Sequence, residues 1–183
     1  MANQKKREGN NTRVLAMCAM LSALGVILLY LGALIEVIDL SMALLASLAV
    51  IVLVIEQGGF YPWLIYAVTS VLSLLLVPNK SPAIVYALFM GFYPILKEKI
   101  EKIPSRLVRF IIKLAVFNAS MVLMWFVARL LLGELTFGMH IVLVLLLLNA
   151  IFVFYDYALS VMITAYLRVW RKKLRVDRFF RSK

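Results

Sequence analysis

The chain has 183 residues, of which 64% are hydrophobic, and a mean hydropathy of +0.98. Soluble domains are typically about 45–50% apolar, and a soluble fold of this composition would expose apolar patches that soluble monomers avoid. The composition excludes an ordinary soluble domain and predicts one membrane domain, with no room for a second sizeable one.

The net charge is +11, from 20 Lys and Arg against 9 Asp and Glu. Such an excess could indicate nucleic-acid binding, but in a membrane protein basic residues flank the helices and face anionic lipid. We therefore expect contact with the lipid bilayer and no nucleic-acid partner. The lone cysteine, Cys18, lies in an apolar run and offers neither a disulfide nor a metal cluster.

Six apolar segments follow a short basic tail at residues 1–12, which we expect to be disordered or interfacial. The first is longer than a signal-peptide core and has no clear cleavage pattern after it, so it predicts a spanning helix. A membrane domain over 13–170 precedes a basic C-terminal tail at 171–183. The six segments, each near the roughly 20 residues that a spanning helix needs, are 13–35, 37–55, 60–77, 82–96, 107–132 and 139–170.

Turn-forming residues separate most of these segments. The division between the first two is the weakest, because only Glu36 and Asp39 interrupt the apolar run. The segments do not alternate apolar and polar residues as barrel strands would. The pattern therefore predicts an all-α protein, a polytopic bundle of six transmembrane helices.

Lysine and arginine placement predicts the orientation. With the N-terminus inside and six crossings, 17 basic residues fall on the cytoplasmic side, and Lys80 and Arg129 fall at or near the outside. Lys113 lies within the fifth segment near its cytoplasmic end. We expect a multi-pass protein of the bacterial plasma membrane with both termini cytoplasmic.

Polar residues recur along one face of each of the last two segments, at spacings of seven and eleven residues. In the fifth segment they are Asn118 and Arg129, with Trp125 between them; in the sixth they are Asn149, Asp156 and Ser160. Antiparallel helices with matching stripes predict a shared interface or cavity.

Lys113 and Asp156 both fall in the inner half of the membrane at a rise of about 1.5 Å per residue. Pairing lowers the cost of both charges, so we predict an intramembrane polar pair with a structural role. Arg129, Glu134 and His140 gather near the outer surface. They form either an ordinary helix junction or a mouth that recognises a small charged solute.

Ala19 and Ala23 form a small-xxx-small pattern in the first segment. Small residues let helices approach closely, so the pattern serves internal packing or the docking of a partner membrane protein.

Enzymatic signatures are missing from the sequence. One histidine and one cysteine provide no multi-ligand metal site, and no G-x-S-x-G or nucleotide-binding loop occurs. We expect the chain to be no enzyme and to carry no cofactor or metal.

The layout resembles the substrate-binding S component of energy-coupling factor (ECF) vitamin transporters. The opening of the first segment, Arg13 followed by an alanine-rich run to Ala23, is similar to that family's. The resemblance implies a solute-binding subunit that works with a coupling subunit, docked at Ala19 and Ala23, and with separate ATPases. The substrate-binding candidates that it implies are Tyr86, Trp125, Arg129, Glu134, His140 and Asn149.

The residues alone leave three functions open. The first is vitamin-like solute uptake driven by other chains. The second is a non-transporting scaffold or accessory subunit of a cell-envelope assembly, in which the polar stripes are packing devices. The third is a small lipid-handling enzyme or flippase.

Overall fold

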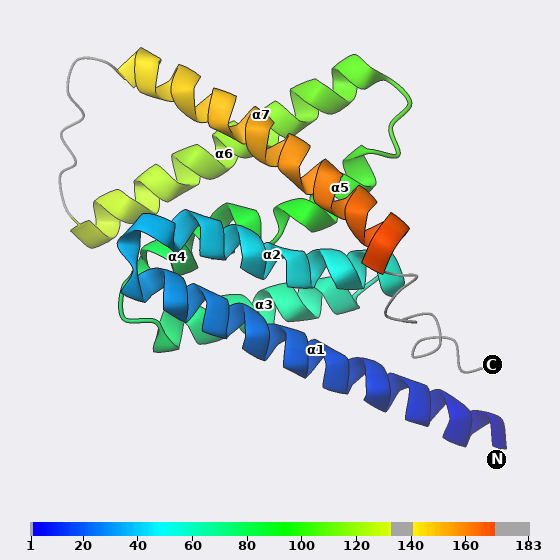
Figure 1. Cartoon of the computed structure of the whole chain (residues 1–183). Coiled ribbons are helices and arrows are strands. Elements are labelled where there is room, and N and C mark those ends of the chain that lie inside the picture. Colours follow the sequence, from blue (N-terminus) through cyan, green and yellow to red (C-terminus); the bar gives the residue numbers. More distant parts are fainter. Residues whose placement is uncertain (1, 133–140, 171–183) are drawn as a thin grey trace. The chain divides into compact units, whose positions relative to one another are not determined.

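The structure, a computed structural model, describes residues 2–132 and 141–170 (Figure 1). Within these residues the regular structure is helical and contains no strand, which confirms the all-α prediction for this part of the chain. The C-terminal tail and the junction containing Glu134 and His140 lie outside the described residues. The α-helices are α1 (Ala2–Leu34), α2 (Asp39–Glu56), α3 (Tyr61–Leu76), α4 (Lys80–Val85), α5 (Tyr93–Ile100), α6 (Arg106–Leu132) and α7 (Ile141–Ala165).

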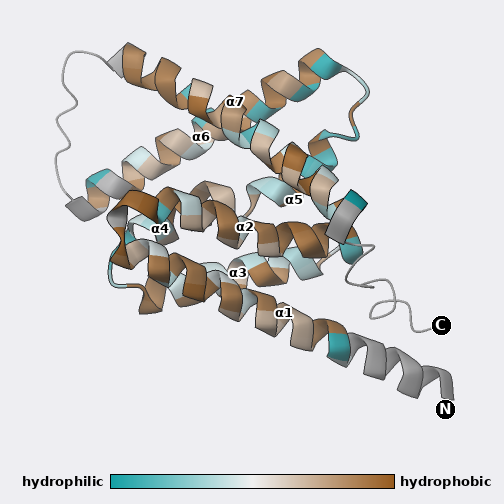
Figure 2. Ribbon diagram, in the orientation of Figure 1, coloured by the Kyte–Doolittle hydropathy of each residue, from teal (hydrophilic) through white to brown (hydrophobic). Residues whose placement is uncertain are grey.

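Apolar residues cover most of the length of the long helices, whereas hydrophilic residues gather at the α5–α6 connection (Figure 2). Four of the described helices contain a stretch long and apolar enough to cross a membrane, and α3 is a shorter apolar helix of 16 residues. The four stretches are Thr12–Leu34, Asp39–Glu56, Arg106–Val127 and Leu143–Arg168. These helices fit a multi-pass membrane protein.

The chain divides into two compact units, each described by itself. The first unit comprises Met1–Ile95 and Ile163–Lys183, and the second unit comprises Leu96–Met162.

In the first unit, α1 packs against α2 and α3. The short 3₁₀ turn η1 (Glu36–Ile38) joins α1 to α2, at the place where the sequence marks the weakest division. Gly58 and Gly59 precede α3 with φ of +60° and +62°, a conformation that glycine adopts without steric cost. The helix α1 begins at Ala2, so the segment expected as a disordered or interfacial tail is helical from this residue on.

The fourth apolar segment is broken, so the prediction of one helix over 82–96 is wrong. Asn79 caps α4 by accepting a hydrogen bond from the Ser81 backbone N–H at 3.0 Å. After Val85 the chain enters a π-helical turn, η2 (Tyr86–Met90), and α5 starts only at Tyr93.

Aromatic packing explains the break. The Tyr66 hydroxyl donates to the Ala87 carbonyl in η2 at 2.8 Å. A Cβ on Gly91 would lie 2.7 Å from Cδ2 of Tyr66 and 2.9 Å from Cε1 of Tyr86. The rings occupy the space that a side chain at this position would need, and the apolar pattern of the segment carries no sign of this tertiary contact.

In the second unit, α6 and α7 cross one another (Figure 1). Phe117 and Phe152 stack across this crossing, with ring centroids 4.5 Å apart and planes 12° from parallel. The sequence-based expectation that the last two segments share an interface is met by this contact.

Replacing Gly91 with alanine should destabilise the first unit, because the new methyl group collides with two rings. We expect a loss of about 1–3 kcal/mol in the free energy of unfolding, measured by reversible denaturation in detergent. Ala67→Met is the control, since it enlarges the side chain at an exposed position of α3. Equal stability of Gly91→Ala and the wild type would contradict the packing described for η2.

Candidate functional site

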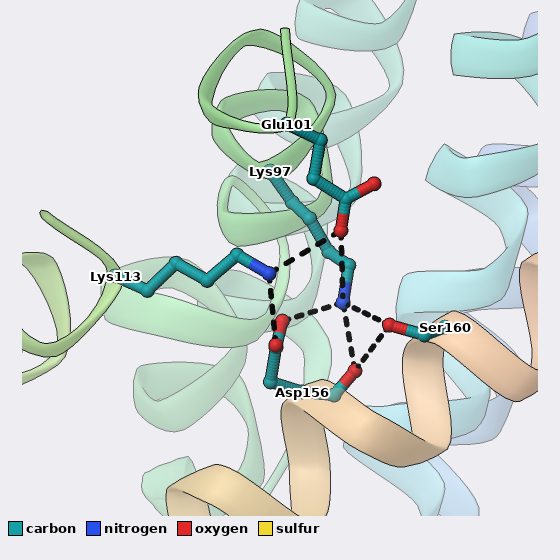
Figure 3. A network of polar contacts seen from close by, with 5 residues as sticks. All are labelled: Lys97, Glu101, Lys113, Asp156 and Ser160. Atoms are coloured by element: carbon teal, nitrogen blue, oxygen red, sulfur yellow. Dashed lines mark hydrogen bonds and ion pairs between the residues drawn. The ribbon is translucent and has the colours of Figure 1, made fainter. Parts of the chain in front are cut away.

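A network of charged and polar side chains lies in the second unit (Figure 3). We call it the Asp156 cluster, and it consists of Lys97, Glu101, Lys113, Asp156 and Ser160. Lys97 and Glu101 come from α5 and the residue just beyond it, and Lys113 comes from α6. Asp156 and Ser160 are one turn apart on α7, so their side chains share a face. Three separate stretches of chain therefore supply the group.

Lys97 is the most deeply buried member, with only 1% of its side chain exposed. Its Nζ donates to the Asp156 carboxylate Oδ1, to the Asp156 backbone carbonyl at 2.7 Å and to Ser160 Oγ at 2.7 Å. These three bonds use all three donors of the ammonium group. Ser160 Oγ donates in turn to the Asp156 carbonyl at 2.9 Å, so that this end of the cluster is closed by hydrogen bonds.

Lys113 occupies the other side of the same carboxylate. Its Nζ donates to Asp156 Oδ2 at 2.8 Å, so the structure brings together the two residues that the sequence analysis paired. Glu101 adds a second anion, with Oε1 at 3.3 Å from the Lys113 Nζ and 3.6 Å from the Lys97 Nζ. Two cations thus face two anions, and the formal charges cancel.

The pairing of opposite charges determines the role that the Asp156 cluster can have. An unpaired ion among apolar helices costs several kcal/mol, whereas here each buried ion has an opposite charge and hydrogen bonds. The described residues hold no group of three or more His, Cys, Asp and Glu side chains that could bind a metal ion. The arrangement is suited to joining α5, α6 and α7 rather than to nucleophilic or metal chemistry.

Sequence reasoning did not assign Lys97 to this group, because it counted Lys97 among the cytoplasmic basic residues. The only local signal was Glu101 four residues later, a spacing that places both on one helix face. That spacing is equally typical of an exposed ion pair, as Lys102 and Glu98 show with their 2.7 Å contact at the surface. Only the approach of α7 distinguishes the two cases.

The polar stripes of α6 and α7 meet at a second point. Asn118 Nδ2 donates to Asn149 Oδ1 at 3.0 Å, and Asn149 Nδ2 lies 3.4 Å from Asn118 Oδ1 in the reciprocal bond. Each Nδ2 also donates to a carbonyl one turn earlier in its own helix, at 2.8 Å in both cases. The two amides satisfy each other, so Asn149 takes part in helix packing at this point.

The other substrate-binding candidates are placed as follows. Arg129 and Trp125 lie one turn apart on α6, both exposed, with the guanidinium carbon 5.5 Å from the ring centroid. Tyr86 is fully buried in the first unit, in η2. Glu134 and His140 lie outside the described residues, and among the described candidates the structure places Arg129 next to Trp125.

The docking candidates lie on the free side of α1. Ala19 and Ala23 are both exposed, whereas the adjacent residues Cys18 and Ser22 are buried. Internal packing therefore uses the other face of this helix.

In comparisons with known proteins, no protein-family model, no curated protein and no solved structure matches the chain.

Removing the carboxylate of Asp156 should destabilise the second unit more than any other single change in the cluster. In Asp156→Asn two buried ammonium groups lose their shared counter-ion, and breaking a buried ion pair in this way costs about 3–5 kcal/mol. Lys97→Met should cost less, because Asp156 keeps Lys113. Reversible unfolding in mixed micelles measures the difference.

Glu98→Gln is the matched control for these variants, since it removes an exposed ion pair next to the cluster. Its expected cost is below about 1 kcal/mol. An Asp156→Asn variant that is as stable as Glu98→Gln would show that the cluster does not hold these helices together.

Proposed function

We propose that this chain is the membrane-embedded solute-binding subunit of an ECF-type uptake transporter. In this proposal it crosses the bacterial plasma membrane six times, with both termini in the cytoplasm, and captures a small vitamin-like solute from outside. Separate ATPase and coupling subunits supply the energy, since the sequence contains no nucleotide-binding loop.

The observation that carries the proposal is the two-sided character of α1. One side is buried against the neighbouring helices of the first unit, and the other presents exposed Ala19 and Ala23 within an apolar stretch of 23 residues. Small residues on a free helix face permit close approach of another membrane helix. These are the positions at which the resemblance to the S components implies contact with a coupling subunit.

The solute-binding part of the proposal rests on Arg129 and Trp125. A guanidinium above an indole ring, both exposed, offers a charged donor together with an aromatic surface. Such a combination fits a solute that carries a ring and an acidic group, and Glu134 and His140 are further candidates from the sequence.

A non-transporting scaffold is the second candidate, and the Asn118–Asn149 contact favours it. The two amides bond to each other and to their own helices, which leaves this part of the polar stripe engaged in packing. In a scaffold, the charge balance of the Asp156 cluster would serve stability alone, and α1 would dock an envelope protein.

Bulky residues at the docking positions should release the partner subunits. We expect native mass spectrometry of the gently extracted wild-type protein to show complexes with a coupling subunit and ATPases. Ala19→Trp and Ala23→Trp should lose these complexes and keep their melting temperature, because both side chains point away from the core.

Ala67→Trp is the matched control, an exposed alanine in the apolar helix α3. It should retain the complexes. Wild-type protein that travels only with cell-envelope proteins would support the scaffold instead of the uptake subunit.

Arg129→Ala tests solute capture separately. A panel of water-soluble vitamins is added to the purified protein, and we expect one of them to raise the melting temperature of the wild type. The shift should disappear in Arg129→Ala and persist in Leu130→Ala, which changes the neighbouring exposed residue. If no vitamin shifts the melting temperature of the wild type, the solute-binding proposal fails.

A further inference from the structure

Two helices of the first unit, α2 and α3, are short for a membrane crossing. In α2 the charged residues Asp39 and Glu56 enclose 16 uncharged residues, and α3 has 16 residues in total. At a rise of about 1.5 Å per residue, each stretch is about 24 Å long, whereas the hydrocarbon core of a typical bilayer is about 30 Å thick. Tilting a helix would shorten the distance that it spans still further.

The other long helices do not share this limit. The apolar stretches of α6 and α7 have 22 and 26 residues, which corresponds to about 33 and 39 Å at the same rise. In the first unit, α1 has 33 residues and extends past α2 and α3 at its N-terminal end (Figure 1). The short spans are therefore a property of α2 and α3 and not of every helix in the chain.

Hydrogen bonds within the first unit hold both charged ends of α2 in place. Asp39 Oδ2 accepts from Ser81 Oγ of α4 at 3.3 Å. At the other end, Glu56 Oε1 accepts from the Tyr166 hydroxyl at 3.3 Å. A long lysine or arginine side chain can carry its charge out of the hydrocarbon, but these two carboxylates are on shorter side chains and are already bonded. The polar ends of α2 therefore stay close to the ends of its helix.

The ends of α3 are bounded in a similar way. Before the helix, Gly58 and Gly59 adopt a positive φ, and lipid-exposed backbone of this irregular kind does not occur within the hydrocarbon. After the helix, Lys80 Nζ donates to the Val77 carbonyl at 2.6 Å, which keeps this charge at the end of α3. The exposed residues of α3 between these ends are all apolar, and Val71 in the middle is 56% exposed. Lipid therefore meets an apolar surface about 24 Å tall.

We propose that the first unit fits a bilayer with a hydrocarbon core about 24 Å thick, and that a thicker core thins where it meets α2 and α3. A bilayer adapts in this way when a hydrophobic span is too short for it. The partner is thus the lipid itself, selected by the length of its acyl chains. The proposal rests on α2 and α3 each crossing the membrane, and it applies equally to an uptake subunit and to a scaffold.

The dependence of stability on acyl-chain length tests this proposal. The full-length protein is reconstituted into fluid phosphatidylcholine vesicles with myristoleoyl, palmitoleoyl, oleoyl or erucoyl chains, in order of increasing length. A Trp125→Phe, Trp170→Phe variant leaves Trp63 of α3 as the only tryptophan, so that its fluorescence follows thermal unfolding of the first unit. We expect the highest melting temperature with myristoleoyl or palmitoleoyl chains and a decline toward erucoyl chains. A maximum with oleoyl or erucoyl chains, or a melting temperature independent of chain length, would overturn the proposal.

Substitutions at the two ends of α2 test whether its length sets the preference. With leucine at positions 39 and 56, the uncharged run would extend from Val37 to position 56, which is 20 residues or about 30 Å. The Asp39→Leu, Glu56→Leu variant should therefore reach its highest melting temperature with longer chains than the wild type. Asp39→Asn, Glu56→Gln is the matched control, because it removes the same charges and keeps the ends polar, so its maximum should not move. A folded leucine variant whose maximum coincides with that of the control would contradict the assignment to α2.

Cysteine labelling separates a failure of this proposal from a failure of the membrane topology. In a Cys18→Ala background, Val37→Cys and Phe60→Cys flank α2 at positions whose native side chains are 92% and 72% exposed. We expect a membrane-impermeant maleimide to label them from opposite sides of the vesicle and to leave Val71→Cys, in the middle of α3, unlabelled. Opposite labelling without a preference for short chains would overturn only the present proposal. Labelling of both positions from one side would overturn the crossing by α2, and with it the six-helix topology of the proposed function.

Discussion

In the second unit a single carboxylate serves two ammonium groups, and the packing of three helical stretches depends on it. Asp156 presents Oδ1 to Lys97 and Oδ2 to Lys113, while its backbone carbonyl accepts from Lys97 and Ser160. Apolar surroundings provide no water to solvate an ion, so each buried charge needs an oppositely charged group in contact with it. The position of α5 and α6 relative to α7 within this unit is therefore specified by chemistry as well as by shape.

The first unit differs, because the polar side chains that are buried among its described residues carry neutral hydroxyls. Two of them, Ser47 and Ser73, bond to carbonyls of their own helix, which requires no tertiary partner. Tyr86 is the first residue of η2, where the fourth apolar segment loses its regular helix. Aromatic rings from α3 and η2 fill the space around Gly91. The break in the fourth segment therefore coincides with the packing of aromatic rings from α3 and η2 around Gly91.

The proposed uptake function separates three tasks along the chain. The free face of α1 offers small residues to a partner, the exposed Arg129–Trp125 pair offers a charged and aromatic surface to a solute, and the Asp156 cluster maintains helix packing. A cluster whose charges cancel has little affinity left for an external ion. This distinction places function at exposed residues and assigns stability to the buried charges.

Composition and hydropathy are enough to predict that lipid surrounds the helices and that charged residues within them need partners. Long apolar runs imply helices whose backbone hydrogen bonds are internal. Because an unpaired charge within the membrane is costly, the sequence also predicted that Lys113 would lie near Asp156. The contact of Lys97 with Asp156 and the break of the fourth apolar segment at Tyr86 became visible only in the folded protein. Both outcomes depend on side chains that are distant in sequence. Lys97 contacts Asp156, and Gly91 packs against Tyr66. The hydropathy of one segment does not indicate which distant residues will contact it.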